Sequence, residues 1–451
     1  MHPATGDPPS SPSQLSSLPK PFTDTASSDT EPHNERRNFV VMVIYQVVMR
    51  MGWIFKTESV IMPAVLDFMG GAGWLRGCLP MFNRFGQSVP PLLMSRRIKV
   101  MPQKSRAVAI CTSMMAFSFL ALSVIWMNVA TPQTWWMPIV FLAFYAFFFI
   151  NTGINQIAFN TVQGKLVRVN RRGRLLLLAS VLGGLVSIVA ALLLLPIWLR
   201  PTDANFGMIF GFAGLAFAGS ALASLFLREQ PDNFQQPRHP FIEHFSNAAR
   251  IIRQDRNLRR LAIVAALFGT SMMLFPHYQA LGRIRLSLTM DNLIWYVVLQ
   301  NAGTALFSLP AGGLADRCGN RLVLRIALLA ICCAPVSALV LAQLDAVGPS
   351  LYFMIFLLVG LTPVTLKTLI NYTLEICDSE DHPRYLSTIS LCVALPVFCS
   401  PLVGWFVDLF SFEAVFITIT VLVFLGWLLT FSLQEPRHHV TDLNPVAVDS
   451  E

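Results

Sequence analysis

The chain has 451 residues, of which 54% are hydrophobic and only 13% are charged. Soluble domains carry about 25% charged residues, so this composition excludes an ordinary soluble globular protein. The net charge of +8 comes from basic residues that cluster between apolar segments. This distribution indicates membrane topology and not a nucleic-acid interface.

Residues 1–38 are rich in Pro, Ser, Thr and Asp and have no apolar periodicity, so we expect a disordered cytoplasmic tail. Twelve apolar segments follow, and each has about the 20 residues needed to cross the hydrocarbon core of a bilayer. The predicted spans are 39–69, 74–95, 107–130, 135–161, 175–199, 206–227, 261–281, 292–314, 322–344, 350–376, 385–409 and 413–433.

Basic residues in the short loops predict the orientation. Residues 96–106 and 165–174 each contain five Lys or Arg residues, whereas residues 128–133 contain none. Lys and Arg are enriched in cytoplasmic loops, so we expect both termini in the cytoplasm. Arg283 and Arg285, after the seventh span, are the one exception to this pattern.

The long polar stretch 228–260 divides the chain into two halves of six spans, 39–227 and 261–435, and residues 436–451 form a second cytoplasmic tail. The later part of this central loop, 242–260, has the pattern of a basic amphipathic helix on the membrane surface. Two six-helix halves are typical of secondary transporters built from repeats. The expected fold class is therefore an all-α membrane protein with twelve transmembrane helices in two repeats.

Charged residues lie inside the first two spans. Arg50, Lys56 and Glu58 interrupt the first, and Arg84 lies halfway along the second. A charge at mid-membrane costs about 2.5–3.5 kcal/mol even on the insertion scale, so such residues persist where they face water or a partner. On one continuous helix, Arg50 and Glu58 would lie about 80° apart. Arg50 could bind an anion and Glu58 a proton; alternatively, Glu58 could pair with Arg84 while Lys56 extends to the outer interface.

Similar polar residues recur in the two halves. Gln156 and Asn160 near the end of the fourth span correspond to Lys367 and Asn371 near the end of the tenth. Their i, i+4 spacing places each pair on one helix face. This match predicts a duplicated half, in which these side chains either contact a solute or form hydrogen bonds between helices.

A charged, glycine-rich loop follows the eighth span and contains Gly312, Gly313, Asp316, Arg317, Gly319 and Arg321. This order of residues resembles the signature loop of the major facilitator superfamily, and the segment 401–408 at the end of the eleventh span is similar to another pattern of that family. The family normally has the signature loop after the second span, where this chain lacks the acid and has Arg96 near its place. The glycines would let two helices approach closely, and Asp316 would bond a helix end as part of a gating latch.

The resemblance implies alternating access around a central cavity next to the first, fourth and tenth spans. The candidate substrate and coupling residues are Arg50, Lys56, Glu58, Arg84, Gln156, Asn160, His277, Gln300, Lys367 and Asn371. Four basic residues against one acid favour an anionic solute, such as a sugar acid, an organic acid or a phosphorylated metabolite. His277 could sense protons, or it could be a structural histidine.

We therefore expect secondary active or facilitative transport of a small solute across the plasma membrane, or across the inner membrane if the source is a bacterium. Proton coupling and facilitated diffusion both remain open, as do a non-transporting sensor or scaffold and an efflux carrier for amphipathic compounds. No catalytic triad, Walker loop or metal-binding spacing is present in the sequence. We expect no enzyme activity, cofactor, metal or nucleic-acid partner; the lipid bilayer, the solute and, for a coupled carrier, protons are the expected partners of a monomer.

Overall fold

The computed structural model describes residues 32–200, 204–231, 250, 252–377 and 381–435, which are almost entirely helical. The helices of the first half are α1 (Pro32–Phe55), α2 (Ile61–Phe68), α3 (Gly73–Val100), α4 (Lys104–Asn128), α5 (Met137–Leu166), α6 (Val169–Trp198) and α7 (Phe206–Leu225). Those of the second half are α9 (Arg256–Ser271), η1 (Met272–Leu274), α10 (Phe275–Leu286), α11 (Asn292–Cys318), α12 (Asn320–Leu341), α13 (Gly348–Leu351), α14 (Met354–Val359), α15 (Thr362–Glu375), α16 (His382–Val397), α17 (Ser400–Leu409), α18 (Phe412–Leu429) and η2 (Thr430–Ser432).

Within the described ranges, eleven helical segments are long and apolar enough to cross a membrane. The predicted second span is also a helix: α3 has 28 residues but carries basic residues at both ends and in its middle. It packs against α5 of its own half and against α17 of the other half. The all-helical membrane fold is therefore confirmed, and the structure is consistent with twelve crossings.

The first span is not one helix. α1 ends at Phe55 and α2 begins at Ile61, so Lys56 and Glu58 lie in a connection and the predicted helical angle between Arg50 and Glu58 is wrong. Pro63 lies in the first turn of α2, where the missing N–H of proline costs no hydrogen bond. The seventh span is likewise interrupted, by η1, directly before the turn that contains Pro276. Discontinuous helices at corresponding positions of two halves mark the solute site in many transporters.

Hydrogen bonds at the end of each half support the predicted duplication. Asn38 of α1 donates to the carbonyl of Arg228 and accepts from its N–H, both at 2.9 Å. Asn257 of α9 accepts from the N–H of Gln434 at 3.2 Å. The same side chain on the first helix of each half thus holds the backbone that follows the last helix. Residues 32–38, which we expected in the disordered tail, form the first turns of α1.

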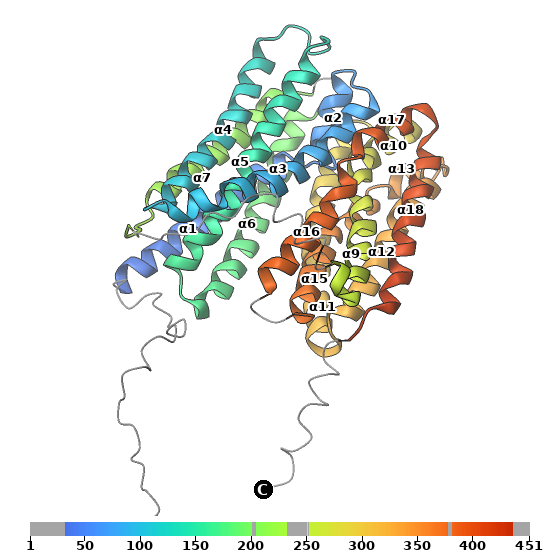
Figure 1. Ribbon diagram of the computed structural model, residues 1–451. Helices are drawn as coiled ribbons and strands as arrows, with labels where there is room; N and C mark the ends of the chain where they lie inside the picture. The colour runs from blue at the N-terminus through green and yellow to red at the C-terminus, as the bar shows by residue number, and fades with distance from the viewer. Residues whose placement is uncertain (1–31, 201–203, 232–249, 251, 378–380, 436–451) are drawn as a thin grey trace, which may run out of the picture.

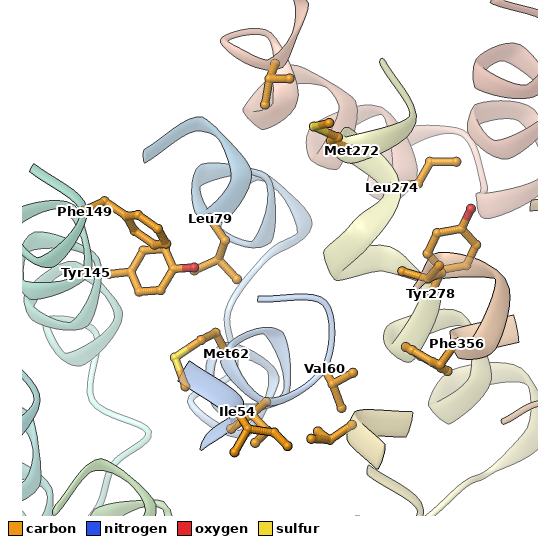
Figure 2. Packing of buried hydrophobic residues seen from close by; sticks show 14 of the residues in the cluster. Ile54, Val60, Met62, Leu79, Tyr145, Phe149, Met272, Leu274, Tyr278 and Phe356 are labelled. Carbon is orange, nitrogen blue, oxygen red and sulfur yellow. The ribbon is translucent and has the colours of Figure 1, made fainter. Parts of the chain in front are cut away.

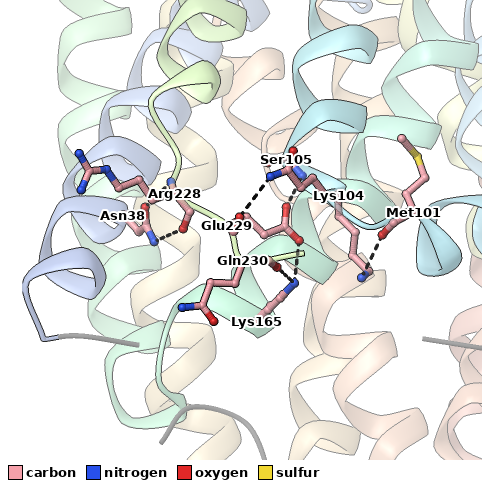
Figure 3. A network of polar contacts seen from close by, with 9 residues as sticks. Asn38, Met101, Lys104, Ser105, Lys165, Arg228, Glu229 and Gln230 are labelled. Carbon is pink, nitrogen blue, oxygen red and sulfur yellow. Dashed lines mark hydrogen bonds and ion pairs between the residues drawn. The ribbon is translucent and has the colours of Figure 1, made fainter. Parts of the chain in front are cut away.

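A glutamate follows each of these two backbone contacts. The buried carboxylate of Glu229 lies 3.1 Å from Nζ of Lys165 and accepts from the N–H of Ser105 at 2.7 Å, near the start of α4 (Figure 3). In the second half, Glu435 lies 2.9 Å from Nε of Arg321, near the start of α12. Both acids therefore attach the end of a half to the start of its third span.

The two halves lie side by side, meet near α2, α10 and α17, and diverge toward the end where α1 begins and α11 ends (Figure 1). At the meeting end, α3 and α17 are in backbone contact, because a Cβ atom on Gly73 or on Gly404 would overlap the other's carbonyl. Only glycine permits so close an approach of two helices.

Large apolar side chains fill the interior on both sides of this contact. Figure 2 shows Met62, Leu79 and Tyr145 among the buried side chains of the first half, and Met272 and Tyr278 among those of the second. These residues are at most 4% exposed. Polar and charged side chains are therefore exceptions in this interior, and their presence needs a physical reason.

The signature loop is part of two helices. Gly312, Gly313, Asp316 and Arg317 belong to α11, and Gly319 joins it to α12 with a φ of 86°, a conformation that favours glycine. No atom lies within 4 Å of a Cβ built on Gly312 or Gly313, so the expected close helix approach at these glycines is not present in this conformation. The first part of the predicted amphipathic segment, residues 242–249, together with residue 251 and the tail 436–451, lies outside the described residues.

Candidate functional site

A cavity of about 690 Å³ lies between the two halves. Its walls come from α1, α3, α4, α5 and α6 on one side and from η1, α10, α11 and α15 on the other, together with the connection between α1 and α2. Clefts of 300–1,000 Å³ are typical of small-molecule sites. The volume therefore fits a solute the size of a common metabolite.

Eight of the ten sequence-predicted site residues line this cavity. They are Arg50, Lys56, Glu58, Arg84, Gln156, Asn160, Gln300 and Lys367. Among the described lining residues, the four basic side chains and Glu58 are the only ones with a formal charge. The break in the first span is what places Lys56 and Glu58 at the cavity.

Lys56 does not extend to the outer interface, as its position in the sequence suggested, and is only 2% exposed. Its ammonium lies 3.9 Å from the ring centroid of Trp53 and 4.1 Å from that of Phe149, with Phe148 and Tyr145 at 5.3 and 5.8 Å. Cation–π contacts of this kind contribute about 0.5–2 kcal/mol each, more where water is excluded. The aromatic cage thus compensates for the removal of this charge from water.

Glu58 is 9% exposed and is held by neutral groups. Tyr145 donates its hydroxyl to Oε2 at 3.2 Å, and Asn83 donates its amide to the same oxygen. Gln87 in turn donates to Asn83. No ion pair within 4.0 Å joins Glu58 to Arg84 in the described part of the chain, so the alternative of a direct Glu58–Arg84 pair is wrong for this conformation; Arg84 instead contacts Sδ of Met272 at 2.7 Å.

Arg50 and Lys367 face the cavity from opposite halves. Neither has a hydrogen-bond or ion-pair partner within the residues that the structure describes. Arg50 packs on α6, where a Cβ on Gly183 would lie 3.1 Å from its Cδ. Lys367 is exposed on α15. These two cations are the free charges of the cavity.

Two predicted residues do not line the cavity. Asn371 is exposed one turn beyond Lys367, in the last turn of α15. His277 is fully buried in the first turn of α10, and neither ring nitrogen has a hydrogen-bond partner. A pore-facing role for His277 is therefore not supported in this conformation.

The sequence analysis missed several residues of the site. Trp53 and Tyr145 complete the surroundings of Lys56 and Glu58, and Asn83 contacts Glu58 directly. Gln46 and Gln163 line the cavity. Gln46 lies one helical turn before Arg50, which is a signal in the sequence that could have identified it.

Polar contacts seal the end of the molecule at which the halves meet. Asp67 binds Arg76 at 2.6 Å and accepts from Gln279 of α10 at 2.8 Å. Asp408 of α17 accepts from the N–H of Gly73 at 2.6 Å and lies 3.5 Å from Arg76. The contacts of Asp67 with Gln279 and of Asp408 with α3 cross between the halves and place the cavity's closed side at this end.

Comparison with known proteins agrees with this architecture. Residues 279–447 match the family model of the Major Facilitator Superfamily. By sequence, the chain matches no curated protein.

Solved structures match over nearly the whole chain. The nucleoside transporter NupG has a TM-score of 0.63 at 13% identity, covering 89% of this chain and all of NupG. A bacterial homologue of the human lysosomal transporter Spinster, in an inward-facing state, has a TM-score of 0.64 at 12% identity, covering 92% of this chain and all of the other. The human organic anion transporter MFSD10 has a TM-score of 0.57 at 16% identity, covering 89% of this chain and all of MFSD10.

The fold and the interdomain cavity define a multi-pass membrane protein with the architecture of a solute transporter. The sequence match of residues 279–447 to the Major Facilitator Superfamily confirms the resemblance seen in the signature loop for that part of the chain, and the whole chain has the same fold as the solved transporters.

Proposed function

We propose that the protein carries a small anionic solute across the plasma membrane by alternating access. The observation that carries this proposal is the cavity with four basic side chains and one acid, in which Arg50 and Lys367 have no partner among the described residues. Such a cavity has a positive potential and concentrates anions. An anion bound there would supply the missing counter-charge.

Arg50 and Lys367 belong to different halves, which suggests how binding could favour a change of conformation. A solute shifts a conformational equilibrium only if it interacts differently with the two states. An anion that contacts both cations stabilises states in which the halves approach each other around it. With cytoplasmic termini, the conformation described here is closed outside and opens inward.

Glu58 is the proposed proton site of a coupled carrier. It lies in the cavity at the break of the first span, where neutral donors hold its carboxylate and Lys56 is two residues away. Protonation would remove the only negative charge of the described lining. The cavity would then attract an anion more strongly, which is the sign needed for joint transport of proton and anion.

Counterflow in proteoliposomes tests the transport function. Vesicles loaded with a mixture of organic anions should take up labelled gluconate, glucose 6-phosphate or succinate, and Arg50→Gln and Lys367→Gln should each lower the uptake at least about tenfold, the effect of losing about 1.4 kcal/mol of interaction. Arg106→Gln removes the same charge from an exposed position outside the cavity and should behave as the wild type. Uptake of neutral solutes that is unaffected by Arg50→Gln would overturn the proposal. A sensor or scaffold would show no counterflow.

Glu58→Gln tests coupling separately. This variant should retain counterflow, which needs no gradient, but lose accumulation driven by an imposed pH gradient. Accumulation at the wild-type level would exclude Glu58 as the coupling group. The structural neighbours do not select among solutes, since the names of NupG and MFSD10 refer to nucleosides and to organic anions.

A further inference from the structure

Carboxamide side chains form a second set of free polar groups in the cavity. Nine of the described lining residues are Asn or Gln, and five of them hydrogen-bond to other protein groups. The other four have no hydrogen-bond partner within the described chain: Gln46, Gln156, Asn160 and Gln163. Their amides therefore remain available to a solute or to water.

The four free amides lie on two adjacent helix faces. Gln156, Asn160 and Gln163 follow an i, i+4, i+7 pattern on α5 and span about 10 Å along the axis. Gln46 lies one turn below Arg50 on α1. The two helices are joined at this level, because Tyr45 stacks on Phe159 at 4.9 Å and accepts from Asn155 at 2.8 Å. The amide face is thus next to the cation that we propose to bind the anion.

The chemistry of these groups restricts the solute. A carboxamide offers two donors and an acceptor, as a hydroxyl offers both a donor and an acceptor, whereas a carboxylate or phosphate dianion only accepts. Lysine and arginine, which only donate, would suffice for a simple organic acid. A row of amide oxygens, in contrast, needs hydrogen-bond donors from the ligand. Binding of a ligand without such donors would remove water from these oxygens without replacing its hydrogen bonds, which weakens binding.

We propose that the solute is a polyhydroxylated anion, of the sugar-acid or sugar-phosphate class. Its acid group binds near Arg50 and Lys367, and its hydroxyls exchange hydrogen bonds with Gln46, Gln156, Asn160 and Gln163. The stacked Tyr45 and Phe159 provide an apolar surface for the C–H groups of such a ligand. This inference rests on the anion function proposed above and adds the hydroxyl requirement to it.

Four types of probe test the anion function and the hydroxyl requirement separately. Thermal stabilisation of the purified protein is measured with gluconate and glucose 6-phosphate (hydroxyls and charge), hexanoate (charge only), sorbitol (hydroxyls only) and hexanol (neither). The two hydroxylated anions should bind roughly tenfold or more tighter than hexanoate and sorbitol, because a site built for hydroxyls rejects analogues that lack them. Gluconate carries a carboxylate on an open chain and glucose 6-phosphate carries a phosphate on a pyranose ring, so their relative affinities show which of these two forms of hydroxylated anion the site prefers.

Two outcomes overturn different statements. Equal stabilisation by hexanoate and gluconate, or none by either hydroxylated anion, refutes the hydroxyl requirement. Equal stabilisation by sorbitol and gluconate refutes the anion function itself.

Variants locate the effect. Gln156→Leu and Asn160→Leu should reduce the preference for gluconate over hexanoate by roughly 5- to 10-fold each, about the effect of one hydrogen bond, and Arg50→Gln should weaken both anions. Asn151→Leu is the matched control on α5, since Asn151 bonds its own helix and lies outside the cavity. An unchanged preference in both cavity variants, with folded protein confirmed by the midpoint of unfolding, would contradict the assignment.

Discussion

Gly183 offers a way to disturb Arg50 without changing any charge. A Cβ at this position would lie 3.1 Å from Cδ of Arg50 and 3.4 Å from its Cβ, which is closer than most real contacts, so the arginine must shift by a few tenths of an ångström. A side chain forced about 30° off its rotamer costs about 0.5–1.5 kcal/mol. Since 1.4 kcal/mol corresponds to a factor of ten, Gly183→Ala should raise the half-saturating gluconate concentration by roughly 2- to 10-fold.

The neighbouring residue provides the matched control. No atom lies within 4 Å of a Cβ on Gly184, yet Gly184→Ala brings the same gain in helix propensity, about 1 kcal/mol. Counterflow of labelled gluconate gives the half-saturating concentration, and thermal unfolding reports the stability of both variants. If the two variants have equal gluconate affinity, the position of Arg50 does not determine binding, and the reasoning that assigns the anion to it fails.

Three other changes test the remaining features. Glu229→Gln should lower stability by about 1–3 kcal/mol, because the buried acid loses its charge-assisted contacts with Lys165 and Ser105, and Glu435→Gln should do the same in the second half; thermal unfolding measures both. Trp53→Leu combined with Lys56→Met in a double-mutant cycle should show a coupling energy of about 0.5–2 kcal/mol, and additive effects would exclude the cation–π contact. Asp408→Asn should weaken the contact with Arg76 that helps to close the outer end. A cysteine introduced as Gln300→Cys, in a background without native cysteines, should then react faster with an impermeant maleimide added outside. Unchanged labelling would mean that other contacts keep this end closed.

Much of the cavity could be predicted because membranes penalise polar groups. Arg50, Glu58, Arg84 and Lys367 lie in apolar segments, where a charge must face water or a partner. Gln156 and Asn160 were identified by a different signal, their correspondence with Lys367 and Asn371 in the second half. Polar residues within apolar segments thus predict which side chains line the cavity, although they give no detail of the groups around those side chains.

The surroundings depend on distant parts of the chain. The cage of Lys56 combines Trp53 with residues of α5 that lie about ninety positions later, and no local pattern shows that these rings meet. The break after Phe55 has no glycine, and only Pro63 marks the first turn of α2. Asn371 shares a helix face with Lys367 but lies one turn further along, past the cavity. Spacing on a helix therefore predicts the side to which a side chain points, but not how far along the helix the cavity extends.

Arg283 shows how structure explains an apparent exception to the topology rule. It lies on the predicted outer side, where basic residues are depleted, and its Nη1 is 3.8 Å from Asp67. Its neighbour Arg285 lies 2.6 Å from Glu413. Both therefore have acidic partners on that side.

The distribution of charge partners separates structural from functional cations. Arg76 has two acids within 3.5 Å at the sealed end, and Lys165 has Glu229 at the other end. Arg50 and Lys367, in the cavity, have none within the described residues. Arg76 and Lys165, which hold parts of the fold together, are thus paired with acids, whereas under the proposed function the counter-charge of Arg50 and Lys367 comes from the bound anion. Removal of Arg50 should therefore impair gluconate binding far more than it changes the unfolding temperature, and removal of Arg76 should do the reverse.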